Sequence, residues 1–247
     1  MVTRALSNPL LGAQSPAAHA PDLSRTERRL GAISGLAYLV TILGVGIVLG
    51  GSGPVLGDPV GDYGAFVAGH TATPKFWGAV FAEGVALLLS IFFLTALYAV
   101  IRGRGRSGAW AASAALSAGL ISTVVKLAAI PVVVVAVDRG TDLRPDLTTA
   151  LFEANAWAFV LTFGIDAAFL AAASLAILQT NTLPRWLGWA AAGIAPLLLV
   201  AVVLAKHDVP LLLLYFAWVL AACIALIRTP RRSEEHLPVS APGNALF

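Results

Sequence analysis

The 247-residue sequence has few of the side chains that metal, thiol or haem chemistry uses: one cysteine, one methionine and four histidines. A membrane thiol oxidoreductase needs at least a cysteine pair, and Cys223 is alone. A membrane b-type cytochrome needs histidines that face one another inside helices. Here His19 and His236 lie in the terminal segments, and His70 and His207 lie in connecting segments. The sequence therefore predicts no metal site and no cofactor.

Charge is also scarce, at 12% of residues against roughly 25% in soluble domains. Hydrophobic residues make up 58% of the chain, and the mean hydropathy is +0.85. The apolar runs are too long for a globular core, so lipid must surround them. The formal net charge of +3 does not indicate nucleic acid, because the arginines flank apolar runs instead of alternating with aromatic residues. We expect membrane lipids, and no nucleic acid, as partners.

Six apolar segments are each near or above the ~20 residues that a helix needs to cross a bilayer. They predict an all-α polytopic membrane protein, a six-helix bundle with helices at about 31–52, 77–101, 108–137, 152–178, 186–205 and 209–227. The terminal segments mix charges with serine, proline and alanine, and show no helical period. The predicted organisation is therefore a disordered tail (1–30), one transmembrane domain (31–228) and a second disordered tail (229–247).

Lysine and arginine are distributed unequally between alternate connections, and such an excess marks the cytoplasmic side. One side has eleven, namely Arg4, Arg25, Arg28, Arg29, Arg102, Arg104, Arg106, Arg185, Arg228, Arg231 and Arg232. The other side has Lys75, Arg139, Arg144 and Lys206, together with six aspartates. This alternation predicts that both termini are cytoplasmic and that the protein lies in the cytoplasmic (inner) membrane of a bacterium.

Small residues recur four positions apart, a spacing that lets helices approach closely in lipid. The pairs are Gly31 with Gly35, Gly46 with Gly50, and Gly188 with Ala192. We expect them mainly to pack helices within one chain, and the same faces also suit an oligomer interface. The six tryptophans fall mostly near the ends of the expected helices, which is typical of interfacial anchors.

Three charged residues fall well inside the expected spans: Glu83, Lys126 and Asp166, with Glu153 nearer the membrane rim. Each costs about 2.5 to 3.5 kcal/mol at the bilayer centre, so each needs a partner or a wet cavity. Because such a cost is rarely retained without a use, charged residues inside a membrane are candidates for a functional site.

Helical spacing places further polar residues beside these charges. Asn155, Thr162 and Asp166 are 7 and 4 residues apart and share one face of the fourth span. Ser122 precedes Lys126 by one turn in the third span. These residues complete the candidate intramembrane polar cluster.

The simplest arrangement points these polar faces inward, with Lys126 between Glu83 and Asp166 as a charge-compensated triad that opens outward. The competing interpretation is structural. The triad then only fixes the helix register, or Glu83 and Glu153 reach the wet interface while the Lys126 side chain extends to the headgroups.

The sequence leaves three functions open, and does not decide whether the protein is an enzyme. The first is a protein that binds or passes a small solute, a proton or an amphiphile through the polar cluster. The second is a small intramembrane enzyme for a lipid or isoprenoid substrate, with Glu83 or Asp166 as general acid and an aromatic pocket around Phe159, Phe163 and Tyr98. The third is a structural or accessory subunit with a dry, fully packed interior.

Three stretches of the chain resemble a bacterial integral-membrane family, domain of unknown function 4386. They are KFWGAVFAEGVALLLSIFFLTALYAVIRG, GLISTVVKLAA and TLPRWLGWAAAGIAPLLL. In the last, Leu183, Pro184, Arg185, Trp186, Leu187 and Gly188 form a short loop that opens a helix. The resemblance covers roughly residues 28–228 and implies a six-helix membrane protein without an assigned activity.

Overall fold

The structure is a computed structural model that describes residues 23–49, 60–70, 73–103, 108–204 and 209–228. Within these ranges the chain forms seven helices and no strand. They are α1 (Arg25–Leu49), α2 (Val60–His70), α3 (Pro74–Ile101), α4 (Ala109–Asp138), α5 (Pro145–Thr180), α6 (Arg185–Val203) and α7 (Val209–Arg228). All except α2 are long and apolar enough to cross a membrane. The chain is therefore an all-α, multi-pass membrane protein, as its sequence predicts.

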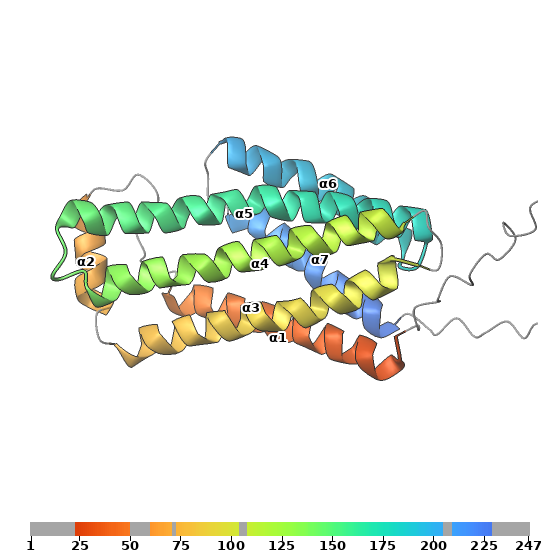
Figure 1. Ribbon diagram of the computed structural model, residues 1–247, viewed down its shortest axis with the longest axis horizontal. Coiled ribbons are helices and arrows are strands. Elements are labelled where there is room, and N and C mark those ends of the chain that lie inside the picture. Colours follow the sequence, from red (N-terminus) through yellow and green to blue (C-terminus); the bar gives the residue numbers. More distant parts are fainter. Residues whose placement is uncertain (1–22, 50–59, 71–72, 104–107, 205–208, 229–247) are drawn as a thin grey trace, which may run out of the picture.

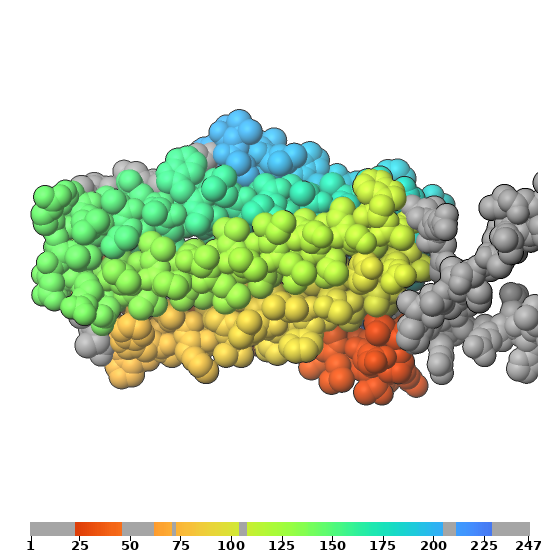
Figure 2. All heavy atoms as spheres, in the orientation of Figure 1, coloured from red at the N-terminus to blue at the C-terminus, as the bar shows by residue number. Residues whose placement is uncertain are grey.

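The six long helices form a closed ring. In order around it, α1 packs against α3, α3 against α4, α4 against α5, α5 against α6, α6 against α7, and α7 against α1. The start of α1 and the end of α7 lie at one end of the bundle, and α2 lies across the other end (Figure 1). Figure 2 shows α3, α4 and α5 side by side as one closely packed face.

The first helix begins at Arg25, so residues 25–30 belong to it and not to the predicted tail. The backbone N–H of Ser24 donates to Oε2 of Glu27 at 2.7 Å, and the Glu27 N–H donates to Oγ of Ser24 at 3.2 Å. This reciprocal capping box satisfies two amides that a helix start leaves free, and it starts the helix before the apolar run. The remainder of both predicted tails lies outside the described residues.

The fifth helix begins at Pro145, seven residues before the predicted start of its span. Proline suits the first turn of a helix, where its missing N–H removes no hydrogen bond. The 36 residues of α5 extend about 54 Å, well beyond the ~30 Å hydrocarbon core. The sequence prediction included only the apolar part of this helix, residues 152–178, and the helix extends beyond it at both ends.

The short helix α2 was not predicted, and His70, expected in a loop, is its last residue. It packs against the end of the bundle where α4 finishes and α5 begins. Tyr63 and Val67 are buried there, and the Tyr63 ring lies 5.6 Å from that of Phe152 on α5. Eleven residues are too few to cross a bilayer, so hydropathy does not reveal this helix. Its apolar side chains are covered by the ends of α4 and α5, whose positions the sequence does not reveal.

Large apolar side chains cover the outside of the bundle as well as filling its inside. Phe81, Val40 and Val203 are each more than 70% exposed. A soluble protein would not tolerate such a surface, but lipid tails cover it without cost.

Trp218 corrects the expectation that the tryptophans are interfacial anchors. It is buried in the core, where its indole N–H donates to the Leu187 carbonyl at 2.9 Å and its ring packs edge-on against Phe169. Trp110 and Trp186 are exposed at helix starts, as anchors are. Trp218 instead joins α7 to α6 and α5.

Two glycines of α1 lie where the helix meets its neighbours. A Cβ at Gly31 would overlap Ala96 of α3, and a Cβ at Gly35 would lie 2.6 Å from Sγ of Cys223 on α7. A Cβ at Gly188 on α6 would lie 2.9 Å from Cγ of Leu178 on α5. Gly31, Gly35 and Gly188 therefore serve contacts within the chain, the use that the sequence favoured. The Gly46 and Gly50 pair lies outside the residues whose surroundings are described, and an oligomer stays a prediction.

Replacing Gly35 by valine should disrupt the packing of α1 against α3 and α7, because its Cβ would meet Phe93 and Cys223. We expect the free energy of unfolding in mild detergent to fall by about 1 to 3 kcal/mol. Gly44→Val is the matched control, since no atom lies within 4 Å of its added Cβ. Equal stabilities of the two variants would contradict this packing.

Candidate functional site

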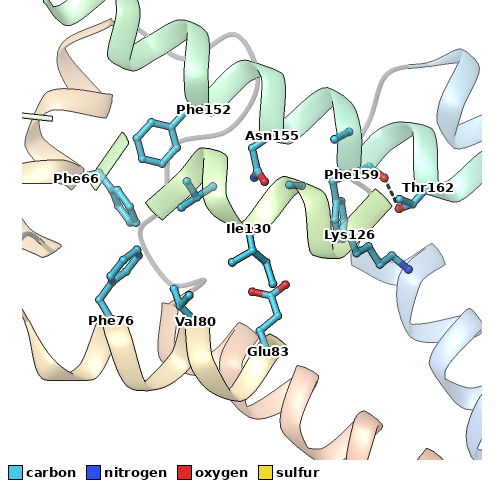
Figure 3. A pocket seen from close by; sticks show the side chains of 13 residues that line it. Phe66, Phe76, Val80, Glu83, Lys126, Ile130, Phe152, Asn155, Phe159 and Thr162 are labelled. Atoms are coloured by element: carbon cyan, nitrogen blue, oxygen red, sulfur yellow. Dashed lines mark hydrogen bonds between the residues drawn. The ribbon is translucent and has the colours of Figure 1, made fainter. Parts of the chain in front are cut away.

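A cavity of about 250 Å³ lies between α2, α3, α4 and α5, towards the end of the bundle that α2 crosses (Figure 3). Its wall combines aromatic and aliphatic side chains with a few polar ones. The lining residues are Phe66, Phe76, Val80, Glu83, Lys126, Ala129, Ile130, Val133, Phe152, Asn155, Ala158, Phe159 and Thr162. Four of the six residues of the predicted polar cluster are among them: Glu83, Lys126, Asn155 and Thr162.

Asp166 and Lys126 form a buried ion pair between α5 and α4. The Lys126 ammonium donates to Oδ2 of Asp166 at 3.0 Å, and the Ser122 hydroxyl donates to Oδ1 at 2.6 Å. The Asp166 side chain is only 2% exposed. A buried carboxylate needs an opposite charge and further hydrogen bonds, and both are supplied here. Lys126 thus points inward and does not extend to the headgroups.

Glu83 is not part of this ion pair, so the expected triad is divided. Figure 3 shows the Glu83 carboxylate and the Asn155 side chain pointing toward one another across the cavity, while the Lys126 ammonium points away from Glu83. That ammonium lies 5.8 Å from the centre of the Tyr215 ring on α7. Among the described residues, Glu83 has no hydrogen bond or ion pair, and its interaction with Lys126 is a longer-range attraction between charges that line the same cavity.

Asn155 and Thr162 line the same side of the cavity but differ in what they offer. The Thr162 hydroxyl is fully buried and donates to the Phe159 carbonyl of its own helix at 2.7 Å, as the dashed line in Figure 3 shows. The Asn155 side chain reaches into the cavity and presents both a donor and an acceptor. Of the two, Asn155 is the one placed to meet a ligand.

A second polar layer lies on the far side of Lys126. Ser90 of α3 and Thr123 of α4 are hydrogen-bonded at 3.2 Å beside a small cavity of about 20 Å³, which has room for about one water molecule. Tyr38 and Tyr215 also line it, from α1 and α7. Sequence reasoning missed these two tyrosines, since each stands alone in an apolar run.

Aromatic rings cover the cavity at its α2 end. Phe66 of α2 meets Phe152 of α5 edge-on, with ring centres 5.6 Å apart, and Phe76 of α3 completes this wall. The sequence could not predict Phe66 in this place, because α2 itself was not foreseen.

The aromatic pocket expected around Phe159, Phe163 and Tyr98 does not form. Phe159 lines the cavity, but Phe163 is buried in the core with its ring 5.4 Å from that of Phe159. Tyr98 lies near Arg102, at the end of α3 away from the cavity. Of the three residues, only Phe159 lines the cavity.

In the part of the chain that the structure describes, no group of three histidine, cysteine, aspartate or glutamate side chains is close enough to hold a metal ion. The polar groups that line the cavity are the Glu83 carboxylate, the Asn155 amide, and two groups that are already bonded, the Lys126 ammonium and the Thr162 hydroxyl. They are suited to hydrogen bonding and charge pairing with a ligand.

The chain matches no protein-family model, no curated protein and no solved structure. The resemblance to domain of unknown function 4386 therefore stays a prediction.

Removing either member of the ion pair should leave an uncompensated charge inside the bundle. We expect Asp166→Asn or Lys126→Met alone to lower the free energy of unfolding by about 3 to 5 kcal/mol. The double variant should cost less than the sum of the two, because neither charge remains. Unfolding in detergent measures all three, and strictly additive costs would contradict the pair.

Proposed function

We propose that the protein binds a small amphiphilic solute in the cavity between α2, α3, α4 and α5. One observation carries this proposal: an aromatic cavity inside the membrane domain contains a carboxylate, Glu83, that has no hydrogen bond or ion pair in the described chain. A carboxylate in such a place is costly unless a ligand, a proton or water compensates it. A fully packed structural bundle would have neither the cavity nor the unpaired group.

The size of the cavity supports a small ligand. An apolar cavity of about 150 Å³ accommodates benzene, and this one measures about 250 Å³. It therefore suits a molecule with one ring, or a short branched chain, and a small polar group. Most drug-sized ligands need 300 to 1,000 Å³.

The polarity of the wall supports an amphiphile and sets its orientation. Phe76 and Glu83 are two turns apart on α3, about 10 Å along the axis. Phe66 and Phe152 lie at the Phe76 end. An apolar group would thus lie near α2, and a polar group deeper, beside Glu83 and Asn155.

We further propose that the cavity opens to the outer side of a bacterial cytoplasmic membrane. Arg25, Arg102, Arg185 and Arg228 lie at the starts or ends of helices at the end opposite α2. Basic residues are retained in the cytoplasm, so this distribution favours a cytoplasmic location for that end. We also propose that the chain belongs to the bacterial family called domain of unknown function 4386.

The ion pair favours binding over an open pore. Lys126 lines both the larger and the smaller cavity, and its ammonium is held by Asp166 at 3.0 Å. The enzyme alternative would have to use Glu83 as its acid, because Asp166 is paired and does not line the larger cavity. No observation favours catalysis over binding.

Filling the cavity tests this proposal. Ala129 lines the cavity, whereas its neighbour Ala128 faces the exposed side of α4. We expect purified protein in zwitterionic detergent to show saturable binding of 4-fluorobenzylammonium or 4-fluorobenzyl alcohol, followed by fluorine NMR. Ala129→Phe should abolish it, because the new ring occupies the same space, and Ala128→Phe should retain it. If neither probe binds saturably to the unmodified protein, or if both variants bind alike, the proposal is wrong.

A further inference from the structure

We infer that the ligand of this cavity is a small organic cation, an ammonium carried on an apolar body about the size of one aromatic ring. This inference rests on the proposed function and specifies the chemical class of the solute. It follows from the charge of the cavity wall, the placement of the hydrogen-bond acceptors and the nature of the remaining surface.

The three intramembrane charges sum to −1 when all are ionised, and the excess is at the cavity. Lys126 is neutralised by Asp166 at 3.0 Å, and its ammonium points away from Glu83. Two charged side chains line the cavity, Glu83 and Lys126, and of these only Glu83 has no ion pair among the described residues. A monocation beside Glu83 would bring the whole group to neutrality.

The acceptors around this point match an ammonium. Glu83 approaches from α3 and Asn155 from α5, on opposite sides of the cavity. An ammonium has donors only, so it can bond to the carboxylate oxygens and to the amide oxygen of Asn155 at the same time. Hydrogen bonds between two ionised groups are the strongest of this kind.

The rest of the wall also favours a cation with an apolar body. Phe66, Phe76, Phe152 and Phe159 present ring faces or edges to the cavity, and aromatic faces attract cations. An anion would meet Glu83 without access to a free ammonium. A neutral solute would fit the same space but would leave the carboxylate without a charge partner.

The experiment compares two probes of nearly equal size, 4-fluorobenzylammonium and 4-fluorobenzyl alcohol, by fluorine NMR titration of the full chain in zwitterionic detergent at neutral pH. We expect the ammonium to bind at least about tenfold more tightly. Glu83→Gln should reduce this preference to about one, because it lowers the affinity for the ammonium far more than the affinity for the alcohol. Glu153→Gln is the matched control, because it removes a carboxylate of α5 that does not line the cavity, and it should retain the preference.

The outcomes separate the inference from the proposed function. If the alcohol binds as tightly as the ammonium, or if Glu83→Gln retains the preference, the cavity binds solutes but cation recognition is wrong. If neither probe binds to the folded, unmodified protein, the proposed function itself is wrong. Loss of the preference in Glu153→Gln would place recognition at the surface and would also overturn the inference.

Discussion

The ion pair between Lys126 on α4 and Asp166 on α5 is the contact on which the arrangement of the site depends. It joins two long helices well inside the bundle, at 3.0 Å, and Ser122 completes the hydrogen bonding of the carboxylate. A slip of one helical turn would leave both charges unpaired in an apolar interior, which is far more costly than the loss of a packing contact. The pair therefore fixes the height at which Asn155 faces α3, and so where the cavity lies.

Two consequences follow for the chemistry of the cavity. The positive charge is used inside the protein, so the remaining carboxylate, Glu83, determines the charge that a ligand meets. The length of α5 also matters, because this 36-residue helix exceeds what a bilayer crossing needs, and α2 packs against it. Phe66 of α2 then covers the cavity together with Phe76 and Phe152.

Most of the fold could be predicted from the sequence because lipid imposes a simple requirement on length and hydropathy. All six spans were found, and the errors lie where this requirement ends: α1 starts early at a capping box formed by Ser24 and Glu27, α5 continues beyond the bilayer, and α2 is amphipathic and short. The pairing of Lys126 with Asp166 was foreseen from charge and helical spacing. The separation of Glu83 from that pair was not, because it depends on which way one flexible lysine turns, toward Tyr215 and α7. Periodicity gives the face of a helix but not the rotamer on it.

The central claim is that solutes reach the cavity inside the membrane domain from the α2 end, by passing the aromatic rings of Phe66, Phe76 and Phe152 that cover it there. Thiol labelling tests this most directly, because the single native cysteine, Cys223, is buried. Cysteine is introduced at Val133, which lines the cavity, or at Val124, which is 62% exposed on the outer surface of α4. We predict that a membrane-impermeant methanethiosulfonate reagent added to intact cells modifies Val133→Cys and leaves Val124→Cys, which lipid covers, unmodified. Failure of the reagent to modify Val133→Cys in a correctly folded protein, from either side of the membrane, would contradict the account.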